Sequence, residues 1–281
     1  MAWGHYLVIS ILFTTPLYAT RWNKEKNRYH LDSLCATAQQ IKEAPYRFVQ
    51  CAATLVEEAI RLNLNLISMD TIKVITAFTP FFLATRMADE SIHSNFYDKK
   101  SHKNNNQMNQ NFITAINKGC DLGIISLSSL AILAWNDQLR LTARIFAIGA
   151  LSALYAKDFV KKLHIKACLR PWNEHFNAEK QSYGGFPSGH MIEASYMLTV
   201  WGLQYGLKAA IPLGIFAGLS FGVLVSSNRH YASQAVAGAG FGVAFGLAAH
   251  RLITTKISET MQCNFRINEQ KEPTFCVAYN F

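Results

Sequence analysis

Two short stretches of this chain combine a histidine with small and polar residues. The first is Phe186-Pro187-Ser188-Gly189-His190, and the second is Asn228-Arg229-His230-Tyr231-Ala232-Ser233. A Pro-Ser-Gly turn directly before an apolar helix leaves backbone N–H groups, a hydroxyl and an imidazole at a helix N-terminus. Such an end attracts anions because unpaired N–H groups and the helix dipole both favour negative charge. The first stretch therefore predicts a phosphate site, with Ser188 and Gly189 forming its cradle.

Cationic residues precede the first stretch and accompany the second. Arg170-Pro171 follows a segment that contains Lys161, Lys162 and Lys166, and Arg229 stands next to His230. Guanidinium and ammonium groups hold phosphate oxygens and neutralise the charge that develops on them during transfer. We therefore expect phosphate binding by Arg170, Lys162, Lys166 and Arg229.

The two histidines suit the two remaining roles in phosphoryl transfer. A neutral His230 could attack phosphorus and form a phosphohistidine, which divides hydrolysis into two easier displacements. His190 could then protonate the departing alkoxide. A lone histidine at a helix end is more often a cap, so the prediction depends on the joint occurrence of both histidines with the cations and the Pro-Ser-Gly turn.

Composition favours an anionic partner at a membrane. Hydrophobic residues make up 50% of the 281 residues, and charged residues make up 16%, against about a quarter in typical soluble domains. The formal net charge is +9, which attracts anions such as phosphate esters or lipid headgroups. No nucleic-acid motif accompanies this charge. The six cysteines form no C-x-x-C pattern, so no zinc or iron–sulfur site, and no cofactor, is expected.

Five apolar runs predict an all-α helical bundle. They cover residues 120–135, 141–156, 190–207, 209–227 and 232–250. The run Ala209–Ser227 has no ionisable residue and is about as long as a bilayer crossing, which takes roughly 20 residues. Glycine and alanine recur in the last two runs, as in close-packed membrane helices. We expect several membrane-embedded helices, with a buried soluble bundle as the alternative.

The rest of the chain divides into segments by composition. Residues 1–19 read as a signal peptide or an N-terminal anchor. Residues 20–112 are expected to form an N-terminal helical region, with a short helix at 72–85 and an exposed polar loop at 87–112. The helical core with the site residues spans 113–252, and a C-terminal tail spans 253–281.

At these site residues the chain resembles the type 2 phosphatidic acid phosphatase family, whose superfamily includes vanadium haloperoxidases. That family carries Lys-x6-Arg-Pro, Pro-Ser-Gly-His and Ser-Arg-x5-His-x3-Asp motifs on an all-helical core, and the similarity covers roughly residues 119–250. The resemblance implies that Arg170 binds phosphate, that Ser188 and Gly189 cradle it, that His190 is the general acid and that His230 is the nucleophile.

The chain departs from the family pattern in three places. The motif lysine would fall at Leu163, so Lys162 is one residue away, and helical spacing would still let it reach the site. The motif arginine would fall at Leu224, and Arg229 is the expected replacement. Gln234 occupies the aspartate position, where it is expected to accept the imidazole N–H and fix the tautomer without supplying a charge.

The expected function is metal-independent hydrolysis of a phosphate monoester or pyrophosphate of a membrane lipid. The expected location is a bacterial inner membrane with the active site facing the periplasm. The alternatives are a soluble exported acid phosphatase of broad range, and a catalytically weakened homologue that binds phosphorylated lipid. The residues do not encode which lipid is the substrate, nor the oligomeric state.

Overall fold

The computed structural model describes residues 31–105, 110–163, 165–175, 181–267 and 273–279. The predicted signal peptide or anchor at 1–19 lies outside these residues. The helices are α2 (Leu31–Asn65), α3 (Met69–Phe96), α4 (Gln110–Leu133), α5 (Asp137–Lys161), α6 (Gly189–Tyr205), α7 (Leu207–Ser226) and α8 (Ala232–Thr260). A short 3-10 turn, η1, covers Lys166–Cys168. The predicted all-α class is confirmed.

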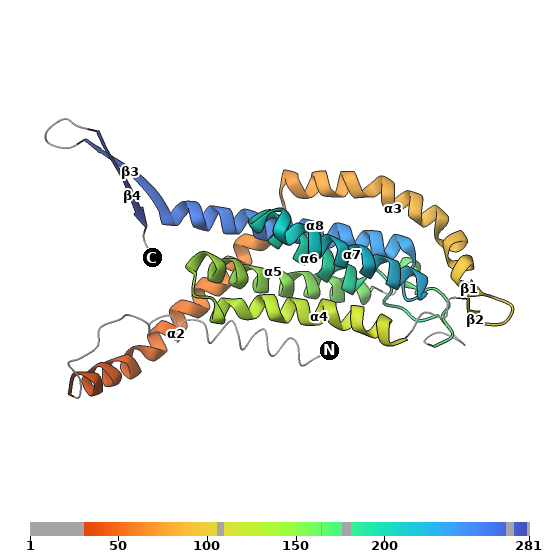
Figure 1. Cartoon of the computed structure of the whole chain (residues 1–281), viewed down its shortest axis with the longest axis horizontal. Coiled ribbons are helices and arrows are strands. Elements are labelled where there is room, and N and C mark those ends of the chain that lie inside the picture. Colours follow the sequence, from red (N-terminus) through yellow and green to blue (C-terminus); the bar gives the residue numbers. More distant parts are fainter. Residues whose placement is uncertain (1–30, 106–109, 164, 176–180, 268–272, 280–281) are drawn as a thin grey trace.

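Two small antiparallel hairpins accompany the helices. Strands β1 (Tyr97–Asp98) and β2 (Lys103–Asn104) follow α3, and strands β3 (Met261–Ile267) and β4 (Pro273–Tyr279) follow α8. Figure 1 shows these hairpins at opposite ends of the bundle, with β3 and β4 projecting away from it. The segment 253–281, expected as a tail, therefore contains the end of α8 and a hairpin.

The N-terminal region differs from the expected pattern. The segment 72–85 belongs to the longer helix α3, which passes through Pro80. The loop expected at 87–112 is also partly wrong, because α3 continues to Phe96 and α4 begins at Gln110. The polar groups of this part of α3 are not all solvated, since Asp89 and His93 are both buried.

Helix α6 lies at the centre of the bundle, where it contacts α4, α5, α7 and α8. Its closest approach is to α8, where an added Cβ at Gly242 would lie 2.5 Å from the Ile192 carbonyl oxygen. Only a residue without a side chain lets the two backbones come this close. On its other side the buried Tyr196 hydroxyl donates to the Phe146 carbonyl of α5 at 2.7 Å. These contacts fix the start of α6 relative to α5 and α8.

Within the part of the chain that the structure describes, four helices are long and apolar enough to cross a membrane, namely α4, α5, α7 and most of α8. The second half of α2, from Phe48, forms a bent pair with α3 that could supply a fifth crossing. On α7 the side chains of Ile211, Ile215 and Leu219 are 58%, 62% and 47% exposed and recur every four residues along one face. An apolar stripe of this kind fits lipid contact far better than water. The predicted membrane location is supported on these grounds.

Candidate active site

The Pro-Ser-Gly turn leads directly into α6. Ser188 is the residue before the helix, with extended backbone angles, and Gly189 and His190 begin it. The Ser188 N–H donates to the Gln234 carbonyl at 3.1 Å, which ties the turn to the start of α8. An added Cβ at Gly238 would lie 2.6 Å from the Ser188 carbonyl oxygen, so α8 presses directly against the turn. The free N–H groups at this helix start are thereby held in one orientation.

The second histidine lies in the turn between α7 and α8, and asparagines hold that turn. Asn228 has a positive φ of 54°, which asparagine tolerates better than most residues. Its amide donates to the Phe96 carbonyl at 2.8 Å, and its carbonyl oxygen lies 2.9 Å from His93 Nδ1. Asn173 donates to the Ser227 carbonyl at 2.6 Å. These contacts place Arg229 and His230 beside the start of α6.

The His230 ring has a defined tautomer. Its Nδ1 lies 2.7 Å from the Gly185 carbonyl oxygen. Because a carbonyl only accepts, Nδ1 carries the proton and Nε2 keeps its lone pair. Burial, followed by the nearby Arg170 and Lys161, holds the pKa of His230 well below its ordinary value. His230 is therefore a neutral imidazole with an available Nε2 at physiological pH.

His230 opens onto a cavity of about 170 Å³ at the end of the bundle where the α5–α6 and α7–α8 connections meet. The lining combines both predicted histidines with four cationic side chains, two carboxyl groups, a glycine and a leucine: His190, His230, Lys157, Lys161, Arg170, Arg229, Asp121, Glu193, Gly189 and Leu224. An excess of positive charge around a neutral imidazole is an arrangement suited to binding a phosphate dianion.

Arg170 is held by the backbone on both sides of the cavity. Its Nη1 donates to the Arg229 carbonyl at 3.2 Å, and its Nη2 donates to the Gly184 carbonyl at 3.3 Å. The Arg170 guanidinium group is thus oriented before any ligand binds, which reduces the entropy lost on binding. Arg229 lines the same cavity, while Leu224 stands at the position where the family motif has its arginine.

Five of the predicted site residues line the cavity: His190, His230, Arg170, Arg229 and Gly189. Ser188 lies next to it, with a fully buried hydroxyl that has no partner among the described residues. Lys162 is exposed at the end of α5 and is not in the lining. Lys166 lines a different cavity. The cationic positions are taken instead by Lys157 and Lys161, one helical turn apart on α5.

Gln234 has a different role from the expected one. The partner of His230 Nδ1 is Gly185. The Gln234 amide instead donates through Nε2 to the Leu169 carbonyl at 2.7 Å, and its Oε1 accepts the Tyr231 N–H at 3.2 Å. Gln234 thus joins the segment carrying Arg170 to the segment carrying His230, and acts on the site through the backbone.

Sequence reasoning missed the two carboxyl groups of the cavity. Asp121, on α4, and Glu193, one turn after His190 on α6, place ligand atoms within 4.8 Å of one another and of a His190 nitrogen. Three such groups could hold a cation, but the four cationic side chains of the same cavity oppose one. The His-x-x-Glu spacing was the available signal for Glu193.

Comparison with known families gives one match in this region. The model of the PAP2 superfamily matches residues 140–258, which contain every predicted site residue. The resemblance drawn from the sequence is confirmed over this segment. No curated protein matches the chain. Among solved structures, a transmembrane PAP2 type phosphatidylglycerolphosphate phosphatase from Bacillus subtilis aligns with a TM-score of 0.43 and 15% identity, covering 68% of this chain and 98% of that one.

Proposed function

We propose, from the PAP2 superfamily match over residues 140–258, that the chain is a membrane phosphatase that removes a terminal phosphate from a phosphorylated lipid. The observation that carries the proposal is the position of His230. Its Nδ1 proton is held by the Gly185 carbonyl, and the ring lines a cavity with four cationic side chains. A neutral, oriented imidazole facing a phosphate-binding cavity is the arrangement that nucleophilic phosphoryl transfer requires.

In the first step the His230 Nε2 lone pair attacks phosphorus, and the bond between phosphorus and the ester oxygen breaks. Arg170, Arg229 and Lys161 bind the three non-bridging oxygens, whose charge they neutralise. Burial, followed by the nearby cations, of which Arg229 acts most strongly, lowers the pKa of His190 to about 4, and the negative charge of a bound phosphate dianion would raise it again. We propose that His190 is protonated in that complex and transfers its proton to the departing oxygen, so the lipid leaves as a neutral alcohol. The Gly189 N–H adds a donor from the helix end.

In the second step water attacks the phosphohistidine. His190, now neutral, takes a proton from the attacking water, while the bond between phosphorus and Nε2 breaks. Inorganic phosphate leaves, His230 returns to its neutral form, and His190 is again protonated. The two histidines therefore complete the cycle without a metal ion.

Because the hydrogen-bond partner of the His230 ring is the Gly185 backbone carbonyl, we expect slower turnover than a carboxylate partner would allow. Phosphorylation of Nε2 makes the ring cationic, and a carbonyl dipole stabilises a cation less than a full negative charge does. Arg229 supplies positive charge where Leu224 does not, but it enters from the turn before α8 rather than from α7. We therefore propose an active but weakened variant of the family chemistry.

The substrate is proposed to be a lipid because the site lies at the end of helices with exposed apolar faces. The proposed orientation faces the site toward the periplasm of a bacterial inner membrane. Lys208, at the start of α7, and Arg251, in the last third of α8, lie toward the opposite end of the bundle. Cationic residues that flank membrane helices favour the cytoplasmic side.

The test is phosphate release from short-chain lipid phosphates by the purified full chain. We expect His230→Ala to remove turnover and His250→Ala to keep it, because His250 lies about five helical turns after the start of α8 and contacts Gln204. Binding of the same lipid is measured in parallel. Equal background rates in wild type and His230→Ala, with lipid still bound, would make the protein a lipid-phosphate binder and refute the enzyme.

A further inference from the structure

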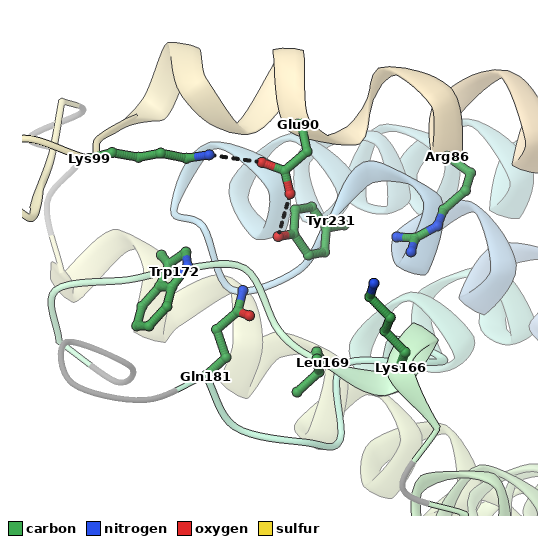
Figure 2. Close-up of a pocket in the computed structure, with 8 residues that line it drawn as sticks. All are labelled: Arg86, Glu90, Lys99, Lys166, Leu169, Trp172, Gln181 and Tyr231. Atoms are coloured by element: carbon green, nitrogen blue, oxygen red, sulfur yellow. Dashed lines mark hydrogen bonds and ion pairs between the residues drawn. The ribbon is translucent and has the colours of Figure 1, made fainter.

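A second cavity, also of about 170 Å³, lies beside the first and contains Lys166, a residue expected to bind phosphate. Its walls come from α3, from η1 and the loop after it, and from the turn before α8. Figure 2 shows Arg86 and Lys166 directed toward each other across this space, with Tyr231, Trp172 and the pair Lys99–Glu90 around it.

The two cavities are separated by a partition formed by residues 169–170 and 230–231. Arg170 and His230 line the first cavity, whereas their neighbours Leu169 and Tyr231 line the second. Gln234 holds the two segments of the partition together through the Leu169 carbonyl and the Tyr231 N–H. Gln181, another lining residue of the second cavity, donates to the Arg170 carbonyl at 3.0 Å. The second cavity is thus a separate compartment that shares its wall with the active site.

The second cavity has an excess of positive charge. Lys99 is paired with Glu90 at 3.1 Å, and the Tyr231 hydroxyl donates to the other oxygen of Glu90 at 3.1 Å. Arg86 contacts Asp89 through Nη1 at 3.1 Å, which leaves Nη2 for another acceptor. Among the described residues the Lys166 ammonium has no ion pair or hydrogen bond. Arg86, which Asp89 partly neutralises, and Lys166 therefore face each other across the second cavity.

We propose that this second cavity binds a phosphate oxyanion between Arg86 and Lys166, as part of an anionic lipid headgroup or as the free ion. The cavity has room for about five or six water molecules at roughly 30 Å³ each, which suffices for a phosphate and part of its ester group. Arg86 and Lys166 supply charge-assisted donors from opposite walls. Trp172, another residue of the lining, is of a type that prefers the membrane interface where headgroups lie.

Binding in the second cavity does not require phosphatase activity. A ligand bound there would affect the active site only through the partition. A phosphate between Arg86 and Lys166 would lie next to Tyr231, whose chain neighbour is His230. Arg86 is also paired with Asp89, which accepts the Ser233 N–H at 3.0 Å at the start of α8. The ligand would therefore stabilise the turn that carries the nucleophile.

The experiment is a calorimetric titration of the purified full chain in zwitterionic micelles with two separate probes, dihexanoyl phosphatidylglycerol and inorganic phosphate. Lys166→Glu should weaken binding of at least one probe by about tenfold or more, the range expected for a hydrogen bond to a charged group. Because Lys166 is exposed and unpaired, this change should leave folding intact. Lys162→Glu is the matched control, since Lys162 is exposed on the same connection and lines neither cavity.

Arg170→Gln separates the two cavities. It should weaken binding in the catalytic cavity and leave the binding that depends on Lys166 unchanged. A Lys166 effect on the lipid probe alone identifies a headgroup site, and an effect on inorganic phosphate alone identifies a site for the free ion. The proposal is refuted if Lys166→Glu binds both probes like wild type, or if Lys162→Glu weakens them equally. Neither of these outcomes bears on phosphate release, which is measured separately.

Discussion

Replacing Gln234 with aspartate introduces the residue that the motif resembled by this chain has at that position, and the contacts of Gln234 predict that this change damages the protein. The partner of the His230 ring is the Gly185 carbonyl, so a carboxylate at position 234 has no vacant role to fill. Gln234 is 1% exposed and uses both ends of its amide on backbone groups. Aspartate has no donor for the Leu169 carbonyl and is one methylene shorter.

The expected size of the effect follows from the groups left unpaired. Loss of the 2.7 Å bond from Nε2 leaves the Leu169 carbonyl without this donor, which costs about 1–3 kcal/mol in a buried setting. The shorter side chain also weakens the 3.2 Å bond from the Tyr231 N–H, at a cost of about 0.5–1.5 kcal/mol. We therefore expect Gln234→Asp to lower the free energy of unfolding by about 1.5–4.5 kcal/mol and to lower kcat/KM, because the partition that positions Arg170 and His230 loosens.

The assay combines chemical denaturation in detergent with phosphate release by the same preparation. Gln234→Glu is the control, since it keeps the side-chain length and the acceptor for Tyr231 but loses the donor to Leu169. It should lose less stability than Gln234→Asp. A rise in kcat/KM for Gln234→Asp would refute the reasoning, because it would mean that residue 234, and not Gly185, orients the nucleophile in the working enzyme.

Two further predictions concern packing and protonation. Gly242→Ala should lower the free energy of unfolding by about 1–3 kcal/mol, since the added Cβ would lie 2.5 Å from the Ile192 carbonyl oxygen. Gly222→Ala is the control and should be tolerated, because nothing lies within 4 Å of its added Cβ. Equal thermal midpoints for the two variants would contradict the close approach of α6 and α8. Because the pKa of His230 is lowered in the folded protein, the unfolded chain binds more protons than the folded one below about pH 6.5. As the pH is lowered through this range, the free energy of unfolding should therefore decrease, and this group contributes up to about 1.4 kcal/mol per pH unit. His230→Gln should lack that portion of the slope in denaturation curves at pH 7, 6 and 5, and an unchanged slope would show that His230 is not buried neutral.

The helices that frame the site could be predicted from the sequence because their apolar runs are long and nearly free of charge. The turn at Ser188 and Gly189 could be predicted for a related reason, since a Pro-Ser-Gly sequence ahead of an apolar run has one common structural use. Both signals are local. They depend on residues next to one another in the chain, and tertiary contacts do not change their interpretation.

Helical spacing does not predict the cationic partners, because the helix breaks between the lysines and Arg170. Helix α5 ends at Lys161, and a loop with η1 separates it from Arg170. Lys162 and Lys166 thus do not share a helix face with Arg170, while Lys157 and Lys161 lie one turn apart within α5 and face the cavity. The position of a helix end shifts by one or two residues on small energy differences, and here it decides which lysine reaches the site.

The polarity of the segment after Thr85 predicts a loop, and the structure differs there for another reason, since α3 continues to Phe96. Asp89 and His93 look solvated in the sequence, yet they are buried against the turn before α8 and the first residues of that helix, where they bind Ser233 and Asn228. Polarity in this part of α3 reflects long-range hydrogen bonds. Such bonds join residues more than a hundred positions apart, and composition alone does not reveal them.

The contacts from α3 to the turn between α7 and α8 have a consequence for how the protein is made. During synthesis α3 is complete long before Asn228 and Ser233 leave the ribosome, since the bonds to Phe96 and Asp89 span 132 and 144 residues. The Asp89 carboxylate also contacts Arg86, and the Phe96 carbonyl also accepts the Asn105 N–H, but their bonds to Ser233 and Asn228 form only after those residues reach the bundle. Nascent chains that stop before Asn228 therefore lack both the nucleophile His230 and these two partners of α3. A version trimmed to residues 140–258 would lack α3, and with it the Phe96 carbonyl and the Asp89 carboxylate that hold Asn228 and Ser233.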